Sequence, residues 1–356
     1  MQTSVLITGG AGFIGCALAH RLVSAGYEVA VMDVLHPQIH ASPGRPSGLP
    51  KSVQLLTGDV THAPDWDAVL RLVKPTQVVH LAAETGTGQS LYEATRHASV
   101  NVVGTAQLLD ALTRTQLVPD QLVLASSRAV YGEGAWRCRE NVFYPGPRAH
   151  AQLVAGLWDP VGPDGSVAEP LPSSSGRTEA HPTNIYAATK LAQENMLLAW
   201  TTAHGNALSV LRLQNVYGPG QSLNNPYTGI VTLFAQLARS RRPLPVYEDG
   251  RIVRDFVFID DVVESLAAAV ERPAPYPRLL DIGSGVATTI HDLARQVAEL
   301  FDSPEPTVVH KFRDGDVRAA SCDIESAMTE LSWLPTWSLD KGLLALLKWM
   351  DGRTEA

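Results

Sequence analysis

The sequence predicts an α/β protein built on a doubly wound parallel β-sheet, followed by a smaller mixed α/β domain. The chain opens on the buried strand 4–8, which leads through a glycine-rich turn into a helix and then into the strand 28–33. Strand-like apolar runs continue to alternate with helical patterns as far as residue 213, as in a parallel sheet covered by helices on both faces. Beyond that point, helices alternate with only short strands.

Glycines at the first strand-to-helix turn indicate a dinucleotide site. Gly9 permits a tight turn, Gly12 lets the backbone approach a pyrophosphate, and Gly15 lets the helix pack on the strand. The next strand ends in Asp33, roughly 20 residues on, where a carboxylate binds ribose hydroxyls and repels a 2′-phosphate. The sequence therefore predicts a Rossmann domain that binds NAD rather than NADP. The alternative for Asp33 is an acid in an ordinary turn.

The other elements of this domain follow in order. Strands are expected at 53–60, 77–83, 121–127 and 207–213, and helices from the glycine turn to residue 23, at 68–73 and 101–112, and from near residue 186 to about residue 202. Ligands of such a sheet bind at the carboxyl ends of its strands. Asp59 and Val60 could there meet an adenine, and the small residues after His80 could lie against the cofactor. We expect His80 itself to be structural.

Residues 133–183 interrupt the alternation with a Pro- and Gly-rich stretch of little periodicity. A segment of this length is typical of a lid, a binding element or a disordered loop. We expect residues 1–213, including this insert, to form the NAD-binding domain. Residues 214–356 are expected mainly to bind the substrate, with helices at 229–238, 260–270, 289–301 and 339–350 and some elements returning to the first domain.

Composition narrows the class of protein further. The chain has 356 residues, 45% of them hydrophobic, and a net charge of −8, so a packed fold without a nucleic-acid surface is expected. An anionic ligand must then be held by a few local arginines. The three cysteines form no disulfide or zinc pattern, so no metal and a reducing cytoplasm are expected. Neither a signal peptide nor a membrane span is predicted.

A tyrosine and a lysine four residues apart suggest the chemistry. Tyr186 and Lys190 share one face of a predicted helix, and an ammonium beside a phenol lowers the phenol pKa from about 10 toward neutrality. Such a tyrosine can take a proton from an alcohol. The pair also occurs by chance on many helices, so its place after a dinucleotide fold gives it weight.

Together these motifs resemble the extended short-chain dehydrogenase/reductases, and within them the NAD-dependent nucleotide-sugar epimerase/dehydratase family. The resemblance covers essentially the whole chain. It rests on six stretches, Thr8-Gly9-Gly10-Ala11-Gly12-Phe13-Ile14-Gly15, His80-Leu81-Ala82-Ala83, Ser126-Ser127-Arg128-Ala129-Val130-Tyr131-Gly132, Tyr186-x-x-x-Lys190, Asn215-Val216-Tyr217-Gly218-Pro219 and Arg254-Asp255-Phe256-Val257.

The resemblance implies a role for each site residue. Tyr186 would be the base that removes a sugar hydroxyl proton, Lys190 would bind the nicotinamide ribose, and Ser127, selected over Ser126 by its distance from the Val-Tyr-Gly motif, would orient the sugar oxygen. The complete expected cofactor set is Gly9, Gly12, Phe13, Ile14, Gly15, Asp33, Asp59, Val60, Leu81, Ala82, Ala83, Asn101, Ser126, Tyr186, Lys190 and Val216.

One departure from the family narrows the reaction. The 4,6-dehydratases carry an Asp-Glu pair directly after the catalytic hydroxyl residue, and this chain has Arg128 and Ala129 there. Simple dehydration is therefore not expected, and a 4-epimerase that oxidises C4 to a ketone and reduces it from the opposite face is the most economical interpretation. The alternatives are a 4-ketoreductase that consumes NAD(P)H and a non-catalytic NAD-binding protein.

Substrate recognition is expected to use a few polar residues. By family position, Arg254 and Arg318 would bind a diphosphate, with Arg313 next and Asn215 nearby; a surface salt bridge is the alternative for each arginine. The stretches 82–90 and 221–229 resemble bacterial enzymes of the dTDP-L-rhamnose 4-epimerase type, which implies a dTDP-6-deoxyhexose and a sugar pocket lined by Thr87, Gln89 and Ser90. Those enzymes have paired cysteines in the insert, where this chain has only Cys138.

The resemblance also implies a homodimer. The helices that start near Val103 and Tyr186 would pair with their symmetry mates in a four-helix contact. Apolar residues all round both helices are equally consistent with an internal core.

Overall fold

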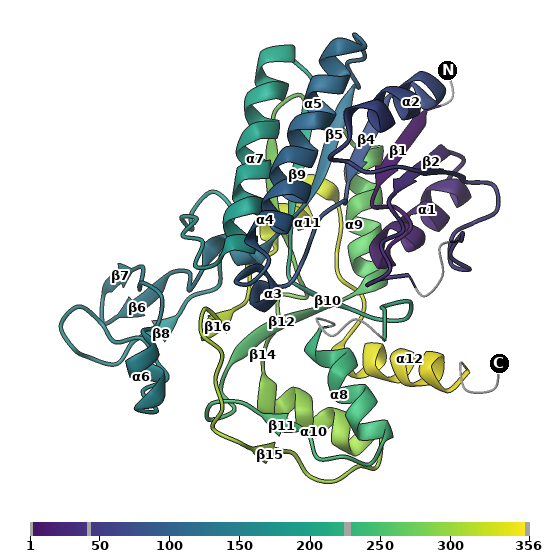
Figure 1. Ribbon diagram of the computed structural model, residues 1–356. Helices are drawn as coiled ribbons and strands as arrows, with labels where there is room; N and C mark the ends of the chain where they lie inside the picture. Colours follow the sequence, from purple (N-terminus) through teal and green to yellow (C-terminus); the bar gives the residue numbers. More distant parts are fainter. Residues whose placement is uncertain (1–2, 41–43, 224–228, 353–356) are drawn as a thin grey trace.

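A sheet of seven parallel strands forms the centre of the computed structural model, which describes residues 3–40, 44–223 and 229–352 (Figure 1). Its strand order is β13 (Arg278–Ile282), β9 (Ala207–Leu213), β5 (Gln121–Ser127), β4 (Gln77–His80), β1 (Ser4–Thr8), β2 (Glu28–Asp33) and β3 (Gln54–Thr57). From β1, the strands β2 and β3 are added toward one edge of the sheet, whereas β4 is added on the other side of β1. This change of direction between β1 and β4 creates the crevice where a doubly wound sheet binds ligands. The predicted fold class is confirmed.

Helices cover both faces of this sheet because alternate side chains of each strand point to opposite sides. Val5 and Ile7 of β1 join the core shared with α1 (Phe13–Ser24) and α9 (Ile259–Glu271), and Leu6 joins the core on the other face. That second face carries α2 (Ala63–Val73), α5 (Gly104–Arg114) and α7 (Ile185–His204). β13 comes from beyond residue 213, so the C-terminal half of the chain completes the large sheet.

Two helices begin earlier than the sequence pattern indicates. α2 begins at Ala63, since Pro64 fits a first helical turn and Trp66 is fully buried. The helix expected from residue 101 instead begins with α4 (Ala94–His97) and reaches α5 through η1 (Ala98–Val103), a stretch of π-helix. Two further short helices, α3 (Thr87–Ser90) and α11 (Glu325–Leu331), have too few turns to show a period.

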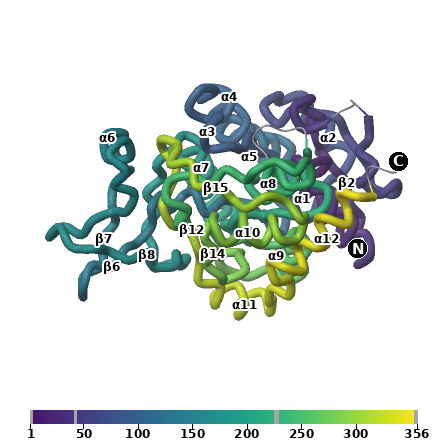
Figure 2. Tube along the Cα trace, turned by 90° about the horizontal axis from the view of Figure 1, so that it is seen from below, coloured from purple at the N-terminus to yellow at the C-terminus, as the bar shows by residue number. Residues whose placement is uncertain are grey.

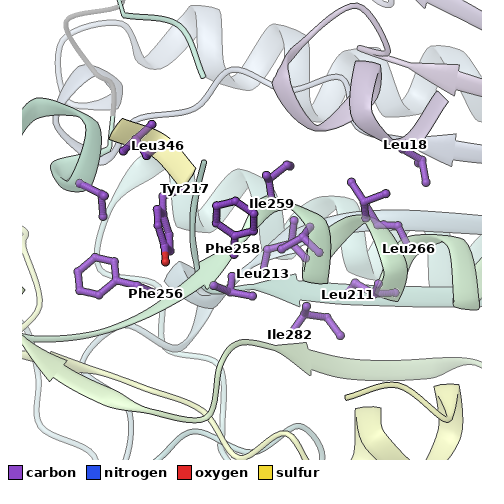
Figure 3. Close-up of a cluster of buried hydrophobic side chains, with 14 of the residues drawn as sticks. Leu18, Leu211, Leu213, Tyr217, Phe256, Phe258, Ile259, Leu266, Ile282 and Leu346 are labelled. Atoms are coloured by element: carbon purple, nitrogen blue, oxygen red, sulfur yellow. The ribbon is translucent and has the colours of Figure 1, made fainter. Parts of the chain in front are cut away.

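The C-terminal elements form a second, smaller layer below the large sheet in Figure 1. Its strands are β10 (Asn215–Tyr217), β12 (Val253–Phe258), β14 (Ala287–Thr289) and β16 (Ala319–Ala320), with β11 (Pro245–Val246) paired to β15 (Thr307–Val308). Its helices are α8 (Ile230–Arg239), α10 (Ile290–Leu300) and α12 (Leu339–Gly352). Figure 3 shows that one core runs from Leu211 and Ile282 in the large sheet to Tyr217 and Leu346 in this layer.

The insert is a small ordered unit that projects to one side of the molecule (Figures 1 and 2). It contains β6 (Trp136–Cys138), β7 (Asn141–Phe143), β8 (Glu169–Pro170) and α6 (His150–Val154), with β6 between the other two strands. Strands of two or three residues carry no detectable period, which explains why the sequence did not reveal them. The insert begins and ends at one point, because a Cβ on Gly132 would lie 2.1 Å from the carbonyl oxygen of His181.

Buried ion pairs attach the insert to the C-terminal layer. Arg148 of the insert pairs with Glu133 (3.2 Å) and with Glu248 (2.9 Å), and Arg318 pairs with Glu248 (2.9 Å), Asp249 (2.7 Å) and the insert residue Asp159 (2.6 Å). Burial raises the pKa of Glu133 and of Glu248, and the neighbouring arginines oppose that rise. We call these residues, Glu133, Arg148, Asp159, Glu248, Asp249 and Arg318, the insert cluster.

Replacing Arg318 should therefore release the insert. Arg318→Met removes a cation that is 3% exposed and leaves Glu248 with one partner fewer, so we expect a loss of about 3–5 kcal/mol in unfolding free energy. Faster hydrogen exchange and proteolysis should appear within residues 133–183. The matched control is Arg139→Met, whose exposed pair with Asp164 lies in the same insert and should contribute at most about 1 kcal/mol. Equal effects of the two substitutions would contradict this role of the insert cluster.

Within residues 3–40, 44–223 and 229–352, no helix is long and apolar enough to cross a bilayer. The same ranges contain no group of three or more His, Cys, Asp or Glu side chains arranged to hold a metal ion.

Candidate active site

The catalytic residues come from two neighbouring elements of the large sheet. Ser127 ends β5, and its Oγ accepts a hydrogen bond from the Ala129 amide (3.2 Å), which caps the short helix η2 (Arg128–Tyr131). Tyr186 lies in the first turn of α7. This helix starts there because Asn184 accepts a hydrogen bond from the Ala187 amide (2.9 Å), a standard N-cap. Ser127 and Tyr186 are joined by a side-chain hydrogen bond, as expected for a pair that shares one sugar oxygen.

The electrostatics of Tyr186 correct one expectation. Burial raises the pKa of Tyr186, while the hydrogen bond with Ser127 and the charge of Arg128 act to lower it. Lys190 is not among these groups, and its ammonium donates to Gln193 Oε1 at 2.5 Å. The expectation of a phenol pKa below its ordinary value is therefore wrong, because burial raises it. Arg128 supplies the cation that acts on the phenol.

Lys190 is held by a buried polar chain that reaches β1. Gln193 accepts from Lys190 and donates to Thr105 Oγ1 (2.8 Å), which lies 3.0 Å from His80 Nε2, and His80 Nδ1 lies 2.7 Å from Thr8 Oγ1. Burial lowers the pKa of Lys190 to about 7 and that of His80 to about 3. His80 is neutral and structural, as predicted. This series of polar contacts holds the Lys190 side chain in one position at the edge of the cofactor crevice.

The glycine turn has the shape that a dinucleotide needs. Gly9 has φ +65°, and a Cβ there would lie 2.7 Å from the Ala82 nitrogen, so the turn and the end of β4 are in backbone contact. A Cβ on Gly15 would lie 2.4 Å from Gly10 Cα. Gly12 begins α1 without a side-chain cap, which leaves backbone N–H groups available for phosphate oxygens. These residues fit NAD, as does Asp33.

Asp33 also braces the turn. Its carboxylate accepts hydrogen bonds from the amides of Ala11 (3.0 Å) and Leu35 (2.8 Å), and His40 Nε2 lies 3.8 Å away. Each carboxylate oxygen has a further lone pair for a ribose hydroxyl. The backbone of Ala11 lies in the turn itself, so the residue expected to select NAD also fixes the loop that would bind its phosphates.

Several expected cofactor residues are already engaged with protein groups. Asn101 bridges the backbone of Glu84 (2.8 and 3.0 Å) to Thr189 (2.9 Å), and Ser126 donates to Glu194 (2.5 Å). Asp59 Oδ1 accepts from the Thr61 amide and hydroxyl. Phe13, Ile14, Val60, Leu81, Ala82 and Val216 belong to the cores on the two sheet faces or pack against them, and the partly buried Ala83 lies in the loop after β4. Asn101 and Ser126 therefore tie the segments beside the crevice to α7.

The expected substrate residues divide into two groups. Ser90 donates to the Thr87 carbonyl (2.7 Å), and Gln89 Nε2 donates to Glu93 (3.0 Å), so these side chains stabilise α3. Arg318 lies in the insert cluster, where carboxylates already bind its guanidinium. Burial alone would lower the Arg318 pKa, but these carboxylates raise it. Of the stretch 221–229, residues 224–228 lie outside the described part of the chain.

Three other polar residues remain suited to a ligand. Asn215 Oδ1 is buried and has no hydrogen-bond partner among the described residues. Arg254 donates to the Val253 carbonyl (2.7 Å) and to Asp316 Oδ1 (2.6 Å). The exposed Arg313 lies over the Tyr247 ring at 5.3 Å and has no ion pair within the part of the chain that the structure describes. As a residue to bind an anion, the geometry thus favours Arg313 over Arg318, which the sequence had placed before it.

Sequence reasoning missed the residues that act through others. Gln193 and Thr105 hold Lys190, and only their burial and distances identify them. Arg128 was visible next to Ser127, but sequence reasoning used it only to argue that the acid of a dehydratase is absent there. Its effect on Tyr186 follows from the fold, which brings β5 and α7 together.

The glycine turn, Asp33 and the Ser127–Tyr186 pair define a Rossmann-type enzyme that uses a dinucleotide. Residues 5–149 and 161–283 match the family described as NAD dependent epimerase/dehydratase family, and the chain belongs to this family. The predicted family, the NAD cofactor and the assignment as an epimerase of the extended short-chain dehydrogenase/reductases are confirmed.

Similar proteins support the assignment over the whole chain. A dTDP-L-rhamnose 4-epimerase of Burkholderia thailandensis is 52% identical over 347 residues, covering 97% of this chain and 94% of that protein. The UDP-glucose 4-epimerase of Thermotoga maritima, solved with UDP-glucose, has a TM-score of 0.81 at 26% identity and covers 98% and 99% of the two chains. The Thermus thermophilus UDP-glucose 4-epimerase, solved with NAD, has a TM-score of 0.77 at 27% identity and equal coverage.

The hydrogen bond between Ser127 and Tyr186 gives a pH-dependent prediction. A base must lose its proton before it acts, so the rate rises with pH through the Tyr186 pKa. Because the Ser127 hydrogen bond lowers that pKa, Ser127→Ala should move the rising limb of the kcat/KM profile to higher pH and reduce kcat about 10²–10³-fold. Ser126→Ala, which removes a hydroxyl bound to Glu194, should leave the limb in place. A limb that does not move in Ser127→Ala would contradict this coupling.

Proposed function

We propose that this enzyme is a 4-epimerase of a dTDP-linked 6-deoxyhexose such as dTDP-L-rhamnose. The observation that carries the proposal is the Ser127–Tyr186 pair followed by Arg128 and Ala129, which supplies an acid–base pair for C4 without the acids of a dehydratase. The 52% identity to a protein named for dTDP-L-rhamnose supports this substrate in particular.

Each of these residues has a proposed step. Ser127 holds the C4 hydroxyl, and Tyr186 takes its proton; NAD⁺ supplies the hydride acceptor when bound. Lys190, held at one position by Gln193, lies where it can bind the nicotinamide ribose. After the 4-keto sugar turns over in the site, Tyr186 returns the proton to the C4 oxygen as the hydride comes back to the opposite face. The base gives back the proton that it took, so no other proton donor is needed.

The substrate site is proposed at the junction of the large sheet and the C-terminal layer. Arg254, Asn215 and Arg313 support it, since they combine a buried cation, a buried acceptor without a partner and an exposed cation. Thr87 is proposed for the sugar pocket. The division into an NAD-binding part to residue 213 and a mainly substrate-binding part beyond it fits this placement, as β9 ends at Leu213 and β10 begins a different sheet.

A homodimer in the cytoplasm is proposed as the working form. Val103 is 46% exposed and Leu198 is 43% exposed, on the two helices expected to pair with their symmetry mates. Cys16, Cys138 and Cys322 are free thiols, which suits a reducing compartment. Sedimentation of the purified enzyme tests the dimer.

The central test is conversion of the sugar. Incubation with dTDP-L-rhamnose should yield its C4 epimer by NMR, with no net change in NADH; NADH consumed in proportion to product would favour the reductase. Tyr186→Phe should lose about 10²–10⁴-fold or more in turnover while it still binds NAD. Tyr92→Phe, which changes a tyrosine that is 89% exposed, is the matched control and should keep full activity. Near wild-type turnover in Tyr186→Phe would exclude it as the base.

A further inference from the structure

Arg128 is a half-buried arginine whose guanidinium has no protein partner. Within the part of the chain that the structure describes, it makes no side-chain hydrogen bond and no ion pair. Each fully buried arginine, by contrast, is bound to carboxylates, carbonyls or hydroxyls: Arg148, Arg212, Arg254, Arg278 and Arg318. A guanidinium withdrawn from water with its donors unused is costly, and a ligand that accepts those hydrogen bonds removes the cost.

The surroundings of Arg128 place it inside the proposed substrate site. It follows Ser127 directly in the chain, and its charge acts on Tyr186. Burial and the nearby Arg254 together lower the Arg128 pKa to about 10, against the opposite effect of Asp316, Tyr186 and Glu133. Glu133 is already bound by Arg148 and by the Arg318 amide, so it is not a free partner for Arg128.

Charge is unbalanced at this point of an acidic protein. Arg128, Arg254 and Arg313 all act on the single carboxylate of Asp316, as does Arg148, which has its own glutamate partners. These three guanidinium groups thus share one carboxylate, while the four carboxylates of the adjoining insert cluster are bound by its own two arginines. The diphosphate link of a nucleotide sugar carries two negative charges, and guanidinium groups bind phosphate oxygens in pairs.

We propose that Arg128 is a further substrate-binding residue, which holds the phosphate that carries the sugar while the keto sugar turns. The inference rests on the proposed function and extends it. Of the three arginines, Arg128 is the one joined in sequence to Ser127 and coupled to Tyr186, so it faces the sugar end of the diphosphate. Arg254 lies beside it, and the exposed Arg313 lies on the solvent side.

A contact that holds this phosphate solves a problem specific to epimerisation. The ketone must leave Tyr186 and present its other face to the same hydride, yet it must not leave the enzyme while the cofactor is reduced. Contacts to sugar hydroxyls break during that turn, whereas contacts to the phosphate persist. Arg128 is thus a substrate-binding residue, which acts by retaining the intermediate.

Binding of nucleotides tests the contact without any turnover. Calorimetry should show that Arg128→Met weakens dTDP, which has the sugar-side phosphate, about 10–100-fold, with less than a twofold change for dTMP, which lacks it. Arg71→Met, an exposed arginine on α2, should change neither affinity. Unchanged dTDP affinity in Arg128→Met, beside a wild-type enzyme that binds dTDP well, would overturn the inference and leave the epimerase proposal intact. If the wild-type enzyme bound neither dTDP nor UDP, the proposed function itself would fail.

A second measurement separates this phosphate contact from a structural role. With dTDP-L-rhamnose, Arg128→Met should release 4-keto sugar and leave enzyme-bound NADH, seen in its absorbance, while Arg128→Lys, which keeps the charge, should recover most of the dTDP affinity. The NAD content of each variant reports whether it is folded. Equal loss of dTDP and dTMP affinity in both variants would assign Arg128 a structural role and contradict the phosphate contact.

Discussion

The site depends on one contact, between the carboxyl end of β5 and the first turn of α7. Ser127 comes from the strand and Tyr186 from the helix, and the proposed proton transfer needs both. Both ends are fixed locally: Ser127 caps η2, and the Asn184 side chain starts α7. The same helix continues to Glu194, which binds Ser126 and Arg212 in the interior (2.5 and 2.6 Å), so the contact is locked one turn beyond Lys190.

The hydrogen bond from Ser126 to Glu194 explains why the two adjacent serines have different roles. Successive side chains of a strand point to opposite sides. Ser126 therefore faces the buried carboxylate of Glu194, and Ser127 faces the phenol of Tyr186. Lys190 is fixed by a separate route, through Gln193, Thr105 and His80 to β1, which ties the base-bearing helix to the strand that precedes the glycine turn. Cofactor turn and catalytic helix are thus parts of one buried polar framework.

The sequence alone was sufficient for the fold class and the glycine turn, and local spacing likewise predicts Ser127, Tyr186 and Lys190 as the catalytic residues. Gly9 to Gly15 must form a turn wherever the strand ends, and a Tyr four residues before a Lys lies on one helix face in any fold. The direction of the Tyr186 pKa could not be predicted in this way, since it depends on burial and on Arg128. Arg318 was assigned to a diphosphate by position, whereas its carboxylate partners come from three distant segments and become visible only when the chain is folded.

The insert is joined directly to η2, the short helix that follows Ser127 and begins at Arg128. Glu133 is the first residue of the insert and lies only two residues after the end of η2, whose first residue is Arg128. Its carboxylate is held by Arg148 and by the Arg318 amide (2.9 Å), so the insert cluster fixes the end of the short helix that carries Arg128. Both ends of the insert meet at Gly132, where the backbone segments are packed too closely to admit a side chain. An arginine without its own protein partner needs such an external brace if it is to stay directed at a ligand. The ion pairs that appear to serve only the insert thereby also hold the proposed phosphate-binding residue at the sugar site.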